Sequence, residues 1–242
     1  MKRLLITCVG AYPIMMDPMT DEVLDSLATG VRVQIQKDLS HADVARKKIY
    51  RENGDKDGRI GLPTEMLFAT LVAAGRKVSY RGKTNISTAE TSMLPGLLTI
   101  NEDFLPFPIP DGATEPKWTV DKRRGRLENG TAVCLRRPKF ADWGFEVTID
   151  FDDKEISEGK VRELFNIAGR FCGLGSFRPS CKGPFGRFAV QKLADITPTE
   201  WANEPAEEIE EGDDTDQTGG EERRTGNSHG RTGTRNGALA GA

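Results

Sequence analysis

The sequence predicts an α+β fold, and three patterns between residues 145 and 193 carry this prediction. Residues 145–151 alternate apolar and polar side chains, as does a strand with one buried face. Residues 156–171 place apolar side chains at the spacing of one helix face, at Val161, Leu164, Phe165, Ala168 and Phe171. A glycine-rich segment then leads to residues 186–193, which are expected to form another strand. The order strand, helix, glycine-rich loop, strand is that of the second half of a ferredoxin-like fold.

The first half of the same fold is predicted upstream. Residues 31–37 alternate as a first strand. Residues 62–75 are mostly apolar and are expected to form a helix, because Pro63 lies near their start and Gly75 at their end, where these residue types commonly bound helices. The chain is therefore expected to fold as one ferredoxin-like (RRM-like) domain over residues 1–202.

Two segments are expected to be insertions into this domain. Residues 40–59 are rich in charge and end in Asn-Gly and Asp-Gly turns. Residues 84–130 begin with a mixture of small polar residues and short apolar runs, and three prolines favour an extended connection there, Pro106, Pro108 and Pro110.

Residues 203–242 form a compositionally distinct tail. They hold ten acidic residues against four arginines, a net charge of −6, which leaves +3 for the first 202 residues. Large apolar side chains are almost lacking after Ile209, so burial cannot offset the entropy cost of ordering the tail. The chain is therefore expected to be disordered beyond about Trp201.

Composition argues against several other classes of protein. The 242 residues are 37% hydrophobic, enough for a substantial core, and no apolar run is long enough to cross a bilayer. The apolar run at residues 4–9 is too short for a convincing signal peptide, so a cytoplasmic protein is expected. The four cysteines lack the paired spacing of a zinc site or a disulfide framework, so neither a metal nor a cofactor is expected.

The loop at residues 173–188 is the most informative functional feature. It contains four glycines, three phenylalanines and three basic residues, and no acidic residue. Glycines permit close backbone approach, cations bind phosphates and rings stack on bases, so the loop is expected to bind nucleic acid. The binding residues predicted here are Gly173, Gly175, Phe177, Arg178, Lys182, Gly183, Phe185, Gly186 and Arg187. In the alternative interpretation the glycines only turn the chain and the phenylalanines enter the core, Phe188 first among them.

A second basic region lies at residues 117–139. It holds eight basic residues against two acidic ones, a local charge of +6, and its glycines predict a loop or hairpin. A solvated charged face is the alternative interpretation of such a run. Five arginines of this region are expected to contribute to nucleic-acid binding, namely Arg123, Arg124, Arg126, Arg136 and Arg137.

The segment from the second predicted helix through the glycine-rich loop to the last strand resembles the RAMP superfamily, RRM-like proteins that build CRISPR effector complexes and process their guide RNAs. In that family the glycine-rich loop touches RNA and insertions form flaps over it, so the resemblance implies both roles here. Residues 182–190 also resemble the RRM signature, although they are expected to form the fourth strand rather than the third. Residues 137–188 are similar to uncharacterised proteins of bacteriophages and prophages.

Few residues offer catalytic chemistry. His41 is the only histidine outside the tail, and the resemblance to RAMP-type RNA endonucleases implies a candidate catalytic centre at His41 with Lys47 and Tyr50. Three aspartates near the end of the predicted strand, Asp150, Asp152 and Asp153, could hold magnesium. An acidic turn that ends the strand is the commoner explanation of such a group.

The expected function is non-enzymatic binding of RNA or single-stranded DNA, as a subunit of a ribonucleoprotein or of a phage nucleic-acid-processing complex. The alternatives are an RNA endonuclease that uses His41 and a structural subunit whose basic loops contact other proteins. The acidic tail is expected to compete with nucleic acid or to recruit a protein partner. Further copies of the chain along the nucleic acid are also expected, and a membrane is not.

Overall fold

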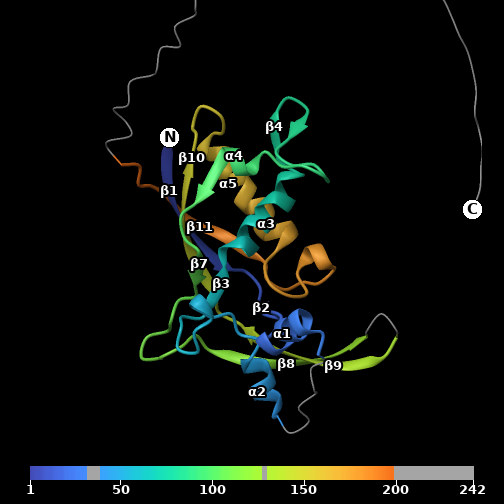
Figure 1. Cartoon of the computed structure of the whole chain (residues 1–242). Coiled ribbons are helices and arrows are strands. Elements are labelled where there is room, and N and C mark those ends of the chain that lie inside the picture. Colours follow the sequence, from blue (N-terminus) through green and yellow to red (C-terminus); the bar gives the residue numbers. More distant parts are fainter. Residues whose placement is uncertain (32–38, 127–129, 199–242) are drawn as a thin grey trace, which may run out of the picture. The chain divides into compact units, whose positions relative to one another are not determined.

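The largest sheet of the protein has four antiparallel strands. The computed structural model describes residues 1–31, 39–126 and 130–198 of the chain. The strands follow the spatial order β11 (Phe188–Asp195), β1 (Lys2–Gly10), β10 (Gly144–Phe151) and β6 (Leu98–Ile100) (Figure 1). Helices pack on this sheet, so the predicted α+β class is confirmed.

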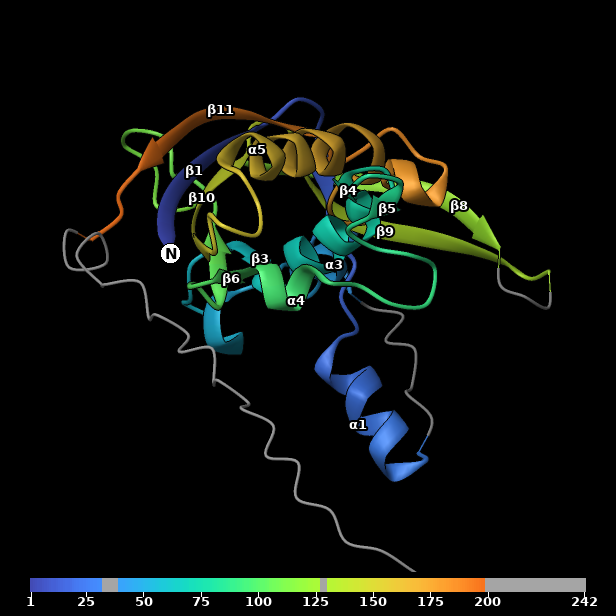
Figure 2. The ribbon, with the colours of Figure 1, turned by 90° about the horizontal axis from the view of Figure 1, so that it is seen from above.

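Two helices, α3 (Thr64–Gly75) and α5 (Glu158–Ile167), pack against each other and bury the same face of the sheet (Figures 1 and 2). Along β1 every second side chain is buried, at Leu4, Ile6 and Cys8, as expected for a strand with one face in the core. The helices contribute apolar stripes to this core, which contain Leu67, Leu71 and Ala74 from α3 and Val161, Leu164 and Phe165 from α5.

The first described strand of this sheet in chain order is β1, and nearly all of the strand predicted at residues 31–37 falls on residues that the structure does not describe. Residues 32–38 lie outside the described residues. The short apolar run at residues 4–9 forms most of β1, which pairs with β10 on one side and β11 on the other. Leu5 and Val9 point to the other face of β1 and are apolar although they are not buried, which is why alternation alone did not reveal this strand.

Four other predicted elements are confirmed to within a few residues. The predicted helix at 62–75 is α3, with Pro63 directly before its first residue. The predicted strand at 145–151 is β10, the helix predicted from residue 156 is α5, and the strand predicted at 186–193 is β11.

The apolar face predicted over residues 156–171 changes direction at its end. After α5 the chain makes one π-helical turn, η2 (Ala168–Cys172), in which the Gly173 amide donates to the Ala168 carbonyl oxygen at 2.8 Å. This wider turn rotates the side chains that follow. Phe171 is consequently 46% exposed while Cys172 is buried, so the prediction that Phe171 lies on the buried face is wrong.

The hairpin predicted within residues 117–139 is confirmed. It consists of β8 (Trp118–Arg126) and β9 (Ala132–Phe140), and β9 also pairs with β2 (Ile14–Met15) to form a second, three-stranded sheet. The fully buried Phe140 ring contacts Phe107 edge to face and joins the base of the hairpin to the core.

The remaining elements occupy the connections between those already described. Between β1 and α3 lie α1 (Asp21–Thr29), α2 (His41–Arg46), a 3₁₀ turn (Glu52–Gly54) and β3 (Gly61–Pro63). After α3 come β4 (Ser79–Arg81), β5 (Thr84–Asn85), α4 (Leu94–Leu97) and β7 (Phe104–Pro106), and a second 3₁₀ turn, η3 (Pro179–Cys181), lies in the glycine-rich loop. β6 belongs to the main sheet although it lies within the predicted insertion at 84–130.

The tail predicted at residues 203–242, with its boundary near Trp201, lies outside the described residues. Among the helices of the described ranges, none has both the length and the apolar character needed to span a bilayer.

Candidate functional site

The glycine-rich loop is folded back on itself, and its glycines make this possible. A Cβ atom added to Gly183 would lie 1.8 Å from the Phe177 carbonyl oxygen. One added to Gly186, whose φ is +68°, would lie 1.8 Å from the Leu174 carbonyl oxygen. Neither position has room for a side chain, so packing alone requires glycine at both.

Three glycine amides of the loop are already used inside the protein. The Gly173 amide donates to the Ala168 carbonyl at 2.8 Å, the Gly183 amide to the Arg178 carbonyl at 3.0 Å and the Gly186 amide to the Pro13 carbonyl at 2.9 Å. All four loop glycines are buried, Gly175 included. The groups that the loop offers to a ligand are therefore mainly its side chains.

The connection between β1 and β2 holds the loop in place. The Ser176 amide donates to the Met15 carbonyl at 2.7 Å, and the amides of Ala11 and Tyr12 both donate to the Arg187 carbonyl, at 2.8 and 3.2 Å. This backbone pairing brings Tyr12 next to the phenylalanines of the loop.

Four side chains from three parts of the chain meet here, and we call them the Arg123 cluster: Tyr12, Arg123, Phe177 and Phe185. The Arg123 guanidinium carbon lies 4.7 Å from the centre of the Phe185 ring and 5.6 Å from that of Phe177. The centres of the two phenylalanine rings are 6.2 Å apart, and the Tyr12 ring meets Phe185 edge to face at 6.2 Å. The structure thus joins the basic hairpin to the glycine-rich loop through cation–π contacts.

The members of the Arg123 cluster differ in exposure. Phe185 is only 8% exposed and Phe177 is 41% exposed, while Tyr12 is 48% exposed. Phe177 also has a φ of +57°, which costs a bulky residue roughly 1 kcal/mol. Arg123 is oriented by Asp121, whose nearly buried carboxylate accepts a hydrogen bond from Arg123 Nε at 2.7 Å. The cluster therefore presents two partly exposed rings beside a positioned cation.

The hairpin divides its cations between two faces. Side chains alternate along each strand and paired residues share a face, and Lys122 pairs with Arg136 while Asp121 pairs with Arg137. Arg123 and Arg137 therefore lie on one face and Arg124, Arg126 and Arg136 on the other. Of the five arginines predicted in this region, the structure brings Arg123 alone into contact with the loop aromatics.

Arg137 and Arg136 are both partly buried in the protein. Arg137 Nε donates to Asp17 at 2.6 Å, and Asp17 also accepts from Lys48 at 2.6 Å, so the charge of Arg137 is neutralised within the protein. Arg136 Nε is buried and has no hydrogen-bond partner among the described residues.

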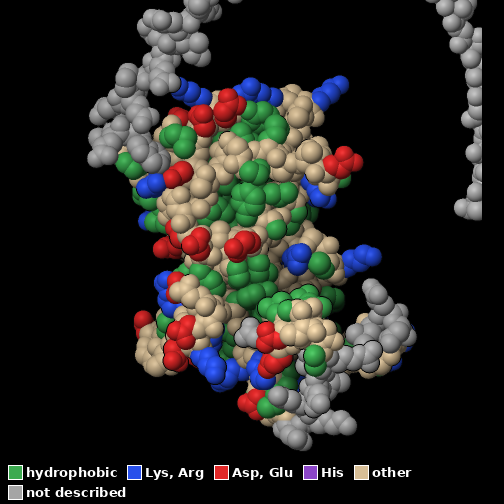
Figure 3. Space-filling view, in the orientation of Figure 1, with side chains coloured by type: hydrophobic (Ala, Val, Ile, Leu, Met, Phe, Trp, Pro, Cys, Tyr) green, Lys and Arg blue, Asp and Glu red, His purple; other side chains and the backbone are tan. Residues whose placement is uncertain are grey.

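Several predicted cations remain open to solvent. Lys182 and Arg187 in the loop and Arg124 and Arg126 on β8 are exposed, and none forms an ion pair within the ranges that the structure describes. On the face shown in Figure 3, Lys and Arg side chains stand among hydrophobic and acidic ones at the end that holds β8 and α2. These four cations are free to contact phosphates.

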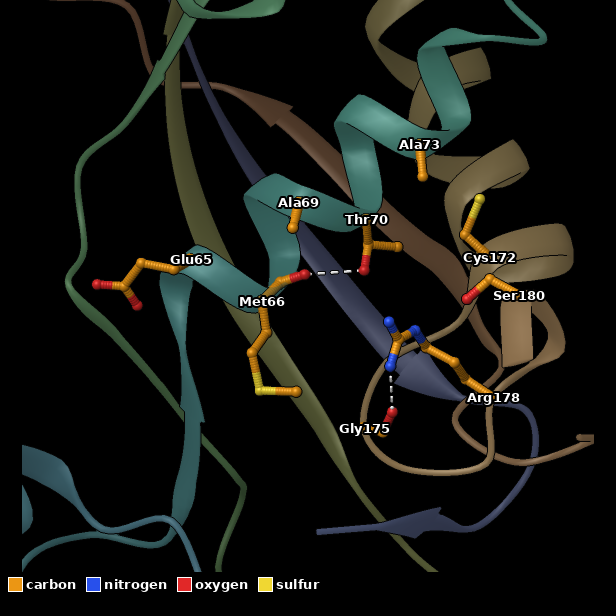
Figure 4. A pocket seen from close by; sticks show the side chains of 9 residues that line it. All are labelled: Glu65, Met66, Ala69, Thr70, Ala73, Cys172, Gly175, Arg178 and Ser180. Carbon is orange, nitrogen blue, oxygen red and sulfur yellow. Dashed lines mark hydrogen bonds between the residues drawn. The ribbon is translucent and has the colours of Figure 1, made fainter. Parts of the chain in front are cut away.

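Arg178 is placed differently from the other cations of the loop. Its Nη1 donates to the Gly175 carbonyl at 2.9 Å, and its side chain lines a pocket of about 280 Å³ between α3 and the loop (Figure 4). The other residues around this pocket are Glu65, Met66, Ala69, Thr70, Ala73, Cys172, Gly175 and Ser180.

The candidate nuclease residues do not form an evident catalytic group. His41 is the exposed first residue of α2, and Lys47 is bound to Glu22 at 2.6 Å. Tyr50 is packed against the core, and burial raises the pKa of its hydroxyl. Among the described residues, no group of three or more His, Cys, Asp and Glu side chains is arranged to hold a metal ion.

The three aspartates at the end of β10 and directly after it, Asp150, Asp152 and Asp153, have separate structural partners. Asp150 accepts two hydrogen bonds from the Arg3 guanidinium, both at 2.6 Å, and this contact holds the pKa of the Asp150 carboxyl below its usual value. Asp152 accepts from the Lys154 amide at 2.9 Å, and Asp153 binds the N-terminal amine at 3.2 Å. These contacts favour the interpretation of an acidic turn.

No model of a known protein family matches the chain, and no curated protein matches it significantly. The candidate site therefore rests on its own geometry. The sequence predictions missed Tyr12, which lies between the buried strand β1 and Pro13 and carries no periodic pattern. An isolated aromatic residue at the end of an apolar run was the only indication available.

Proposed function

We propose that the protein binds single-stranded nucleic acid, either RNA or DNA, and does not catalyse a reaction on it. The observation that carries this proposal is the Arg123 cluster, in which a guanidinium lies 4.7 and 5.6 Å from two ring centres and two rings are partly exposed. Unpaired bases stack on such rings with little regard to sequence, at about 1–3 kcal/mol per base. Bases in a duplex are already stacked, so a single strand is the better ligand.

The solvated cations of the loop and hairpin supply the second part of the proposed interaction. Lys182 lies between Phe177 and Phe185 in the loop and Arg187 follows Phe185, while Arg124 and Arg126 extend the positive charge along the opposite face of β8. Each cation that binds a phosphate releases a counterion, so binding is expected to weaken as salt rises.

The order of the elements supports the proposal of a ferredoxin-like, RRM-like domain. The sheet and its two helices follow one another as strand, helix, strand, strand, helix, strand, in the elements β1, α3, β6, β10, α5 and β11. Together with the resemblance of residues 156–193 to the RAMP superfamily, this order favours a subunit of a ribonucleoprotein or phage nucleic-acid-processing complex. The hairpin β8–β9 takes the part of a flap beside the bound strand.

Fluorescence anisotropy with labelled oligonucleotides of about 15 nucleotides tests the proposal, since single-strand binding folds occupy about 4–16 nucleotides. Oligo(U), oligo(dT) and a duplex of the same length are compared, with polyglutamate as a polyanion that lacks bases. Tighter binding of the single strands than of the duplex and polyglutamate is expected. Equal affinity for all four ligands, or no binding of any of them at low salt, would exclude the proposed binding of single-stranded nucleic acid.

The same samples test the alternatives. Incubation with labelled RNA, followed by electrophoresis, is expected to leave the RNA intact for the parent and for His41→Ala. Cleavage by the parent that His41→Ala abolishes would favour an RNA endonuclease instead. Absence of nucleic-acid binding together with association with other protein chains would favour a structural subunit.

A further inference from the structure

A second exposed aromatic ring lies outside the Arg123 cluster, at Phe171. The ring is 46% exposed, and Lys77 Nζ lies 5.8 Å from its centre. The Arg170 guanidinium carbon lies 5.2 Å from the same centre. An exposed ring between two cations repeats the combination found in the Arg123 cluster.

The backbone explains why Phe171 is exposed. The spacing of the apolar residues along α5 predicts Phe171 on the edge of the buried face of a continuous α-helix, and the π-helical turn η2 rotates Phe171 toward solvent while Cys172 stays buried. Single π-helical turns occur frequently at functional sites. Exposing a phenylalanine forgoes the free energy of burying it, so the turn favours a role for this ring outside the core.

The pocket lined by Arg178, which we call the Arg178 pocket, includes a sequence neighbour of each of the two exposed rings Phe171 and Phe177. Phe171 precedes Cys172, Arg178 follows Phe177, and both Cys172 and Arg178 line the pocket. Its volume of about 280 Å³ is just below the range of sites for drug-sized ligands, so it suits a single ring system.

The pocket is electropositive as well as small. Figure 4 shows the Arg178 guanidinium pointing into the space beside α3, while the Glu65 carboxylate points away from it. Burial raises the pKa of the Cys172 thiol, and the charges of Lys77, Arg178 and Arg76 partly counteract this effect. Several cations thus act on the pocket wall, where they favour an anionic ligand.

We propose that Phe171 is a second base-stacking platform, on a single strand that runs from the Arg123 cluster across the Arg178 pocket. This inference rests on the proposed function and extends it to a defined path. Phe171 and Phe177 are six residues apart, so their backbones are separated by at most about 20 Å, a distance that a short oligonucleotide spans. Arg178 contacts the nucleotide between the two platforms.

The test replaces the Phe171 ring while keeping an apolar side chain. Phe171→Leu removes stacking and Phe171→Tyr keeps it, and oligo(U) and oligo(dT) of about 2 and about 15 nucleotides are bound to each variant, because a dinucleotide is too short to reach both rings. Phe171→Leu is expected to weaken binding of the long oligonucleotides about fivefold or more, whereas Phe171→Tyr binds like the parent. The short ones, held by the Arg123 cluster alone, are expected to bind all variants alike. Ile109→Ala, at a side chain that is 48% exposed, is the control and should bind like the parent.

The possible failures are distinguishable. If the parent binds and Phe177→Ala weakens binding, but Phe171→Leu binds like the parent at both lengths, the second platform is excluded and the proposed function stands. An equal loss at both lengths also overturns the path, because it places both rings in one short site. If the parent binds no single strand at all, the proposed function itself fails.

Discussion

Replacing Phe177 by alanine is expected to weaken nucleic-acid binding and to cost less stability than replacing Phe185. Truncating a buried phenylalanine to alanine costs about 3–5 kcal/mol of stability. Phe185 is only 8% exposed, so Phe185→Ala is expected to cost about that much. Phe177 is 41% exposed, and the same cost scaled by its buried fraction is about 2–3 kcal/mol.

The backbone of Phe177 provides a sharper variant. Its φ of +57° costs a residue with a Cβ roughly 1 kcal/mol, and glycine does not pay this cost. Phe177→Gly is therefore expected to be about 1 kcal/mol more stable than Phe177→Ala, while it lacks the ring equally. Both variants should lose about 1–3 kcal/mol of binding to oligo(U) or oligo(dT), which corresponds to about fivefold to 150-fold in Kd.

Urea unfolding and fluorescence anisotropy on the same preparations measure the two quantities. Anisotropy is recorded only under conditions in which each variant is folded, so that a loss of folded protein is not counted as a loss of affinity. Parent-like binding by Phe177→Gly would refute the assignment of this ring to the binding site. A stability loss at Phe177 as large as that at Phe185 would refute the reasoning from exposure.

Three further predictions concern charge and titration. Lys182→Gln combined with Arg187→Gln removes two phosphate contacts and should flatten the slope of the logarithm of the binding constant against the logarithm of the salt concentration by about 1.4. Between 50 and 200 mM salt the parent is therefore expected to lose about sevenfold more affinity than the variant. Equal slopes would remove both residues from the site. Burial raises the pKa of the Cys8 thiol from 9.0 to about 12. The neutral buried thiol therefore contributes fully to the free energy of unfolding below pH 9, and this contribution is lost as the pH rises toward 12. The free energy of unfolding of Cys8→Ala should accordingly depend less on pH between pH 9 and 12 than that of the parent. In the native parent an alkylating reagent should modify the exposed Cys134 well before the buried Cys8. Removing residues 203–242 should strengthen binding at low salt and leave the melting temperature unchanged, because a segment of charge −6 no longer competes for the cations; weaker binding after truncation would contradict this.

The sequence by itself determined the elements whose patterns are local. Pro63 directly precedes α3 and Gly75 is its last residue, so these two residues marked the ends of the helix in the sequence. The alternation of Phe145, Val147 and Ile149 predicts β10 because successive side chains of a strand point to opposite faces. The concentration of glycine, arginine and phenylalanine between residues 173 and 188 likewise identified the loop of the candidate site before its geometry was known.

Only the tertiary structure decided which distant segments meet. The place of β1 between β10 and β11 depends on two strand pairings whose registers no local pattern encodes. The register of β8 with β9 selects Arg123 over Arg124 for contact with the loop, and the β1–β2 connection brings in Tyr12. The exposure of Phe171 depends on a single π-helical turn, because one additional residue in a turn rotates every side chain after it. Local composition therefore predicted the chemistry of the site, while long-range pairing determined which side chains assemble it.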